Sequence, residues 1–117
     1  MDERRSKKTF TLREAQELLP KVQEITRAPF REAEAIAAKI EDLNDEDDPV
    51  HRKLQKQYLD IVNGWANQVL KLGCEVKAPW LVDFDNGHGY FCWQHPEPDV
   101  EHFHGYEDGF AGRTKIM

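Results

Sequence analysis

The sequence predicts an α+β domain in which a long antiparallel helical hairpin packs on a small antiparallel β-meander of three or four strands. Apolar residues recur every three or four positions over residues 11–72, which is the spacing of a helix face. Over residues 73–117 the period becomes two, and short β-branched or aromatic runs alternate with turn sequences. A chain of 117 residues is long enough for one core and too short for two, so we expect residues 1–117 to form a single domain.

The first helix is expected to begin after a capping box. In Thr11-Leu-Arg-Glu14 the threonine hydroxyl can accept from the Glu14 amide, and the glutamate carboxylate can accept from the Thr11 amide. The apolar periodicity then continues to Leu43. Pro20 and Pro29 each remove a backbone donor, so each predicts either a bend or a break in this helix.

The second helix should return antiparallel to the first. An acidic, turn-forming stretch from Glu41 to Pro49 predicts the exposed loop of the hairpin. The next apolar stripe predicts a helix that begins at Pro49 or Val50, ends near Leu72 and is capped by a left-handed Gly73. We interpret Gly64 as a position where the first helix approaches closely, because glycine is otherwise unfavourable within a helix.

Four short runs predict the strands. They span residues 75–78, 80–85, 90–94 and 100–104, and turn sequences separate them. So few strands need the helices to cover their apolar face, and the hairpin and meander should therefore share one core.

Strand alternation gathers chemically active side chains on the face that points away from the helices. The residues expected there are Asp83, Tyr90, Cys92, His102 and His104. The His-x-His pair, completed by Asp83 and Cys92, permits a tetrahedral zinc site but does not require one. The alternatives are a plain polar sheet face with locally hydrogen-bonded histidines and a site for a ligand other than a metal. A register shift of one residue would move all of these side chains to the opposite face.

Catalytic chemistry is less well supported. Cys92 paired with His102 or His104 would need a lowered thiol pKa, and the acidic surroundings favour the neutral thiol. The short glycine-containing segments lie in predicted turns and lack the strand-loop-helix context of a phosphate cradle. We therefore assign no catalytic residue and favour a protein that is not an enzyme.

The C-terminal stretch is expected to fold back as a turn. Glu107 and Asp108 form either an acid/base set with a histidine or a hairpin feature ahead of the Gly-Phe turn. Arg113 can hold Glu107, Asp108 or Asp83 through two parallel hydrogen bonds, which would tie this turn to the sheet; anion binding is the alternative.

Composition narrows the possible partners. Of the net charge of −6, residues 1–72 contribute −1 and residues 73–117 contribute −5. Acidic surfaces repel phosphate groups, so we expect no nucleic-acid and no membrane partner and favour a metal cation or a basic surface. The sequence has neither a membrane-spanning apolar run nor the apolar core of a signal peptide, which predicts a cytoplasmic protein with Cys74 and Cys92 as free thiols.

An ordered set of short motifs covers most of the chain: Phe10-Thr-Leu-Arg-Glu-Ala, Leu18-Leu-Pro20, Gly73-Cys-Glu-Val-Lys77, Leu81-Val-Asp-Phe84, Phe91-Cys-Trp93, Glu97-Pro98, His104 and Gly109-Phe-Ala-Gly-Arg113. In these motifs the chain resembles a bacterial family catalogued as domain of unknown function 2203. Members have no established activity, so the resemblance implies a fold and a compartment and no catalytic residue. Asp83, Trp93, Glu97 and His104 match the family pattern. His102 departs from it, which makes His104 the better candidate for a site.

Two functional hypotheses follow. The leading one is a non-enzymatic binding or protein-interaction module that self-associates through its helices as a homo-oligomer, most simply a dimer, because the apolar stripe is longer than four strands can cover. The alternative is a zinc-binding protein or metal-dependent enzyme with its site around His104 and His102. Ligand-binding or structural roles are expected for Trp93, Glu107, Asp108 and Arg113.

Overall fold

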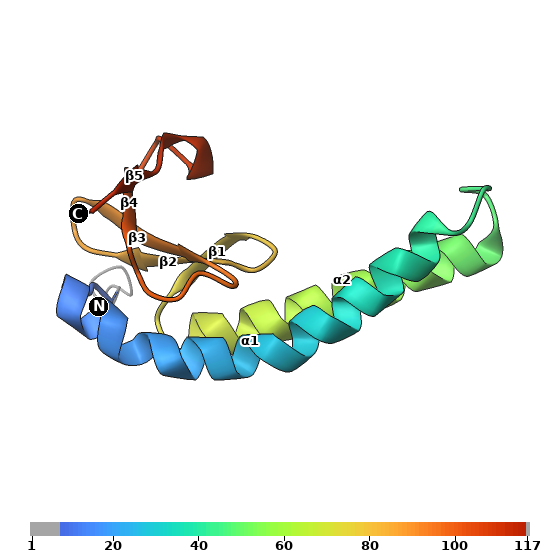
Figure 1. Ribbon diagram of the computed structural model, residues 1–117, viewed down its shortest axis with the longest axis horizontal. Coiled ribbons are helices and arrows are strands. Elements are labelled where there is room, and N and C mark those ends of the chain that lie inside the picture. Colours follow the sequence, from blue (N-terminus) through green and yellow to red (C-terminus); the bar gives the residue numbers. More distant parts are fainter. Residues whose placement is uncertain (1–7, 117) are drawn as a thin grey trace, which may run out of the picture.

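The computed structural model describes residues 8–116 and has three layers: a helical hairpin, a five-stranded antiparallel sheet, and a C-terminal segment on the far side of the sheet (Figure 1). The predicted α+β class and helical hairpin are confirmed, whereas the sheet has five strands instead of three or four. Residues 1–7, which carry most of the charged start on which the signal-peptide argument rests, lie outside the described residues.

Helix α1 (Leu12–Glu41) runs unbroken through both prolines. Its capping box is present, because Thr11 Oγ1 accepts from Glu14 N at 3.1 Å and Glu14 Oε1 accepts from Thr11 N at 2.9 Å. Figure 1 shows α1 as one curved ribbon. Of the two outcomes expected at Pro20 and Pro29, the structure therefore has the bend and not the break.

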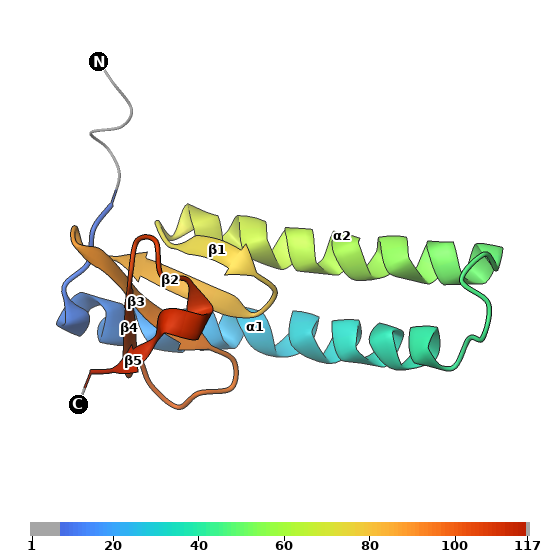
Figure 2. The ribbon, with the colours of Figure 1, turned by 90° about the horizontal axis from the view of Figure 1, so that it is seen from above.

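Helix α2 (Pro49–Lys71) returns antiparallel beside α1, as Figure 2 shows from above. Asp48 caps its first turn through Val50 N, and Gly73 follows its end with the predicted left-handed φ of 94°. The interpretation of Gly64 is wrong: this residue is exposed, and a Cβ atom there would meet nothing within 4 Å. It lies beside Trp65 in sequence but not on the face that Trp65 turns toward the core.

The sheet follows chain order and consists of β1 (Glu75–Ala78), β2 (Leu81–Asp85), β3 (Gly89–Gln94), β4 (His102–Gly105) and β5 (Thr114–Lys115). A short 3-10 helix, η2 (Phe110–Gly112), lies between β4 and β5. Three residues expected in strands, Trp80, Val100 and Glu101, lie outside them. Trp80 has a positive φ of 67° in the β1–β2 turn, and Val100 precedes β4 and belongs to the core instead of the outer face.

The core lies between the sheet and the half of the hairpin next to it. Trp65 of α2 packs against Trp80 with ring centroids 4.9 Å apart, and its Nε1 donates to the buried Thr26 Oγ1 of α1 at 2.8 Å. The other half of the hairpin extends past the sheet (Figures 1 and 2). The sheet therefore covers only part of the apolar stripe that the sequence predicts.

The outer face of the sheet is largely shielded from solvent, whereas the polar-face alternative expects a face open to water. All five residues of β2 are buried, although alternate side chains of a strand point to opposite faces. The helices cover one face of the sheet, and the C-terminal segment covers the other, because η2 lies over the side of the sheet away from the helices (Figure 1). Polar side chains on that face are consequently enclosed.

Candidate functional site

Strand register aligns the candidate residues in two rows across the outer face. Asp83 of β2 is opposite Cys92 of β3, which is opposite His102 of β4. In the next row Tyr90 of β3 is opposite His104. These pairings place all five side chains on the face that the sequence predicts.

Three of the four predicted ligands come together. Ligand atoms of Asp83, Cys92 and His104 all lie within 4.8 Å of one another, and these residues are 0%, 0% and 3% exposed. Within residues 8–116 this is the one group of three or more such residues that could hold a metal ion. His102 is not part of it, because its Nδ1 lies 3.7 Å from Glu97 Oε2 and makes no hydrogen bond.

The hydrogen bonds of His104 restrict what can lie beside its ring. Nδ1 is 2.9 Å from the carbonyl oxygen of Gly105, which only accepts, so Nδ1 carries a proton and donates it. Nε2 is 3.1 Å from Asp83 Oδ1. A neutral ring in this tautomer has a lone pair on Nε2, and an ionised carboxylate has only lone pairs. A proton or a metal ion must therefore lie between the two atoms.

Lys77 of β1 joins the site from its edge. Its Nζ lies 3.2 Å from Asp83 Oδ2 and 3.5 Å from Glu75 Oε1, and it sits 3.8 Å from the centre of the Tyr90 ring. Burial disfavours the charged amine, but Asp83 and Tyr90 outweigh this and raise the pKa of Lys77. We did not predict Lys77, because only the register of β1 on β2, with Glu75 opposite Asp83, brings it beside that carboxylate.

Cys92 is held as a thiol. Burial, followed by the neighbouring Asp83 carboxylate, raises the pKa of Cys92 to about 12, while Arg113 acts in the opposite direction from 3.9 Å. Both nitrogens of His104 already face other groups, so the ring is not positioned to deprotonate Cys92. This geometry does not support a nucleophilic cysteine.

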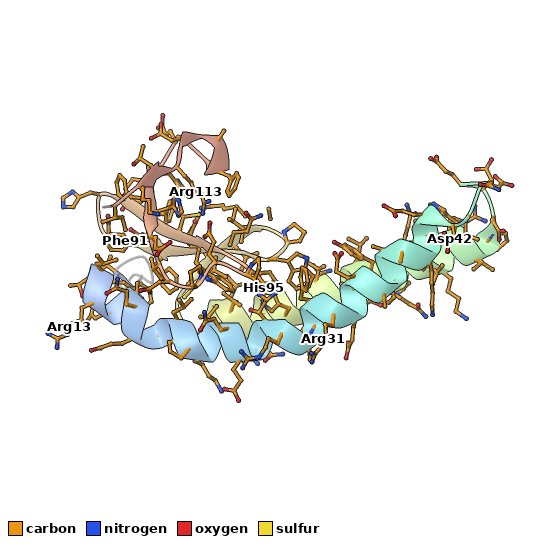
Figure 3. All side chains as sticks on the ribbon, in the orientation of Figure 1. Arg13, Arg31, Asp42, Phe91, His95 and Arg113 are labelled. Atoms are coloured by element: carbon orange, nitrogen blue, oxygen red, sulfur yellow. The ribbon has the colours of Figure 1, made fainter. Side chains whose placement is uncertain are left out.

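The C-terminal segment is tied down by Arg113, but not to the carboxylates predicted for it. Its Nη1 and Nη2 donate to Glu97 Oε1 at 3.1 Å and Oε2 at 2.8 Å. Figure 3 shows Arg113 on the side of the sheet away from the helices. Two further hydrogen bonds position Glu97 for this pairing. Gln94 N donates to its carboxylate, and Trp93 Nε1 donates to its carbonyl oxygen at 2.8 Å. Trp93 thus holds the β3–β4 loop from the buried side of the sheet.

The predicted acidic pair is divided between two roles. Asp108 Oδ2 accepts from Gly105 N at 3.0 Å and forms a turn, which is the structural role expected from its sequence context. Glu107 is exposed and lines a cavity of about 210 Å³. The other residues around that cavity are Lys77, Leu81, Asp83, His104, Tyr106, Gly109 and Phe110. The cavity therefore borders two of the three candidate metal ligands.

The fold and the cluster together define an α+β protein with a helical hairpin on one face of an antiparallel sheet and three enclosed potential metal ligands on the other. The chain belongs to the family described as uncharacterized conserved protein (DUF2203), whose model matches residues 8–116. Searches of the curated proteins and of the solved structures found no match. Among the helices of the described part of the chain, none has the length and apolarity needed to cross a membrane.

Proposed function

We propose that the protein binds a divalent transition metal ion of the zinc class through Asp83, Cys92 and His104. The observation that carries this proposal is the 3.1 Å approach of His104 Nε2 to Asp83 Oδ1 while Nδ1 donates to the Gly105 carbonyl, so that either a proton or a metal ion lies between Nε2 and Oδ1. A metal ion in that position would have the buried Cys92 thiol close enough to supply a third ligand.

The spacing of the donor atoms supports a tetrahedral ion. Zinc binds nitrogen and oxygen at about 2.0 Å and thiolate sulfur at about 2.3 Å, so two N or O ligands of a tetrahedron lie about 3.3 Å apart. The 3.1 Å separation of Nε2 and Oδ1 is close to that value. Because the three donor atoms lie within 4.8 Å of one another, a shift of Sγ by about 1 Å would complete the site.

The charges of the ligands and the contacts around them are also suited to a divalent metal ion. The Asp83 carboxylate and a Cys92 thiolate together neutralise a divalent ion, which avoids a buried net charge. Metal binding would displace the thiol proton. The Gly105 carbonyl orients His104, and Lys77 holds the second oxygen of Asp83, as is usual for groups around metal ligands. Three protein ligands beside a cavity match zinc sites that keep an open position.

Cobalt substitution tests this proposal. The untagged protein should contain about one equivalent of metal by elemental analysis, and a chelator should lower its melting temperature. Loading with Co²⁺ should give the visible bands of a tetrahedral ion and a thiolate charge-transfer band, and Cys92→Ser should remove the latter. Cys74→Ser, which changes the other buried cysteine, is the matched control. An unchanged melt with chelator and no stoichiometric metal would refute the proposal.

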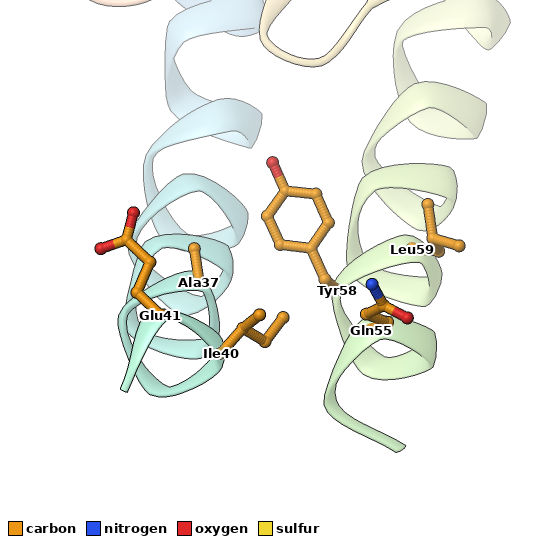
Figure 4. A pocket seen from close by; sticks show the side chains of 6 residues that line it. All are labelled: Ala37, Ile40, Glu41, Gln55, Tyr58 and Leu59. Carbon is orange, nitrogen blue, oxygen red and sulfur yellow. The ribbon is translucent and has the colours of Figure 1, made fainter. Parts of the chain in front are cut away.

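We also propose that the protein self-associates through the uncovered half of its hairpin. There, α1 and α2 flank a cleft of about 490 Å³, lined by Ala37, Ile40, Glu41, Gln55, Tyr58 and Leu59 (Figure 4). The helix face that the sheet covers continues into this cleft without cover. The exposed fraction of Leu59 is 57%, which is large for a leucine on a helix that also contributes to the core.

The charges along this part of the hairpin are complementary to those of a second copy that lies antiparallel to it. Residues 41–48 contain six acidic and no basic side chains, whereas Arg27 and Arg31 lie exposed farther back on α1. Helices rise about 1.5 Å per residue, so these arginines lie about 15 and 9 Å from Ala37 along the axis. In an antiparallel two-fold arrangement centred on Ala37, each acidic loop lies level with the arginines of the other copy. A parallel arrangement would instead bring the two sheets together.

Light scattering across protein concentration tests self-association. Leu59→Glu should shift the protein toward monomer without disturbing the fold, because Leu59 is exposed. Leu70→Glu, at a 50% exposed position near the other end of α2, is the control and should leave association unchanged. A wild-type protein that is monomeric at all concentrations would disprove this proposal.

We further propose a cytoplasmic location, which the two free cysteines support.

A further inference from the structure

We propose that the cavity beside Asp83 and His104 binds a small monocarboxylate with an apolar tail, whose carboxylate completes the coordination of the metal. This inference rests on the proposed metal site and adds the class of ligand that the site takes. It is carried by the position, the size and the lining of the cavity.

The cavity lies on the open side of the three ligands. Asp83 and His104 line it, whereas Cys92 does not. A metal ion held by all three residues would therefore have Cys92 behind it and the cavity in front. The volume of about 210 Å³ would hold roughly seven water molecules at about 30 Å³ each, which limits the ligand to a few carbon atoms.

Lys77 supplies a positive charge on the wall of this cavity. Its Nζ lies 3.2 Å from Asp83 Oδ2. A bound divalent ion would take up the negative charge of Asp83, and the attraction between that carboxylate and Lys77 would weaken. One oxygen of an incoming carboxylate can then bind the metal while the other accepts from Lys77.

The remaining lining distinguishes a monocarboxylate from a phosphate. Phosphate sites normally use an arginine fork or several backbone amides, but Arg113 is engaged by Glu97 and does not line the cavity. Glu107, on the cavity rim, would repel a second negative charge. Leu81 and the exposed rings of Tyr106 and Phe110 provide the apolar part of the wall, where a short hydrocarbon tail would be covered.

The cobalt-loaded protein gives a direct test with butyrate as the probe. Saturable changes in the visible bands are expected on titration with butyrate, with weaker changes on titration with inorganic phosphate. Lys77→Met should weaken butyrate binding at least tenfold, and Lys71→Met, an exposed change at the end of α2, should leave it unchanged. Phe110→Ala, at a 44% exposed position on the cavity wall, should also weaken butyrate binding.

The possible failures can be told apart. A chain that takes up no cobalt overturns the metal site and this inference with it. A normal cobalt spectrum that does not respond to butyrate overturns the ligand alone and leaves the metal site standing. A stronger response to phosphate than to butyrate overturns the monocarboxylate class, as does a Lys77→Met variant that binds butyrate like the wild type.

Discussion

Nε2 of His104 lies 3.1 Å from Oδ1 of Asp83, and the two residues are 21 positions apart in the chain on strands that do not pair with each other. Cys92 belongs to the strand between them. Three consecutive strands thus contribute one ligand atom each to an enclosed group. Replacing any one of these three side chains with another of similar size therefore tests its role in metal binding.

Asp83→Asn should reduce metal affinity more strongly than its small change in shape suggests. An amide oxygen is neutral, so the same ion would leave a net positive charge in a buried site. We expect the affinity for Co²⁺ to fall by more than about tenfold, measured by competition with a chelator of known affinity. Asp85→Asn, on the same strand and face but outside the ligand group, is the control. Equal affinity in both variants would show that Asp83 does not bind the ion.

The link between Glu97 and Arg113 predicts a loss of stability in acid. Burial opposes ionisation of Glu97, but hydrogen bonds from Arg113 and Gln94 outweigh it, and the pKa of Glu97 falls below the ordinary value of 4.5. A lowered carboxyl pKa adds stability that is present above the unfolded pKa and is lost as the pH falls through the folded pKa. Urea unfolding between pH 6 and pH 3, values that lie about 1.5 units either side of the ordinary carboxyl value of 4.5, should show this loss.

In the same titration, Glu97→Gln should be less stable than the wild type near neutral pH and should show a shallower decline in acid. Glu34→Gln, at an exposed position of α1, provides the comparison. If the Glu97→Gln variant follows the wild-type curve at every pH, the pairing with Arg113 contributes no measurable stability.

Thr26 should be sensitive to the loss of its hydroxyl group. Its Oγ1 donates to Val22 O at 2.6 Å and accepts from Trp65 Nε1 at 2.8 Å in the buried core. Thr26→Val keeps the shape but leaves the indole N–H without an acceptor, which should cost about 1–3 kcal/mol of unfolding free energy in urea. Thr26→Ser keeps the hydroxyl and should lose less. Equal losses in the two variants would assign the effect to packing instead of to the hydrogen bond.

Gly64→Ala should stabilise the protein. The position lies inside α2 and is exposed, and the added methyl group would have no neighbouring atom within 4 Å, so only helix propensity changes. The expected gain is about 1 kcal/mol, measured by urea unfolding at low protein concentration. Asn63→Ala, at the neighbouring exposed position, should give a smaller gain. A decrease for Gly64→Ala would mean that this surface is in contact with another molecule.

Local chemistry in the sequence was enough to predict most of the elements. Thr11 and Glu14 cap α1 because their reciprocal hydrogen bonds span only three residues, and Gly73 ends α2 because it alone there adopts a positive φ without strain. The period of two likewise placed Asp83, Cys92 and His104 on one face. For the prolines, local rules left a bend and a break open, and only packing along α1 selected the bend.

By itself, the sequence determined the α+β class, the hairpin and the grouping of Asp83, Cys92 and His104, because periodicity and capping depend on neighbours within a few residues. Only the tertiary structure decided that this group is enclosed, that Lys77 joins it, and that Arg113 holds Glu97 instead of the nearer acids. Those outcomes depend on where the C-terminal segment lies on the sheet. That position is set by contacts between residues far apart in the chain, which no local pattern encodes.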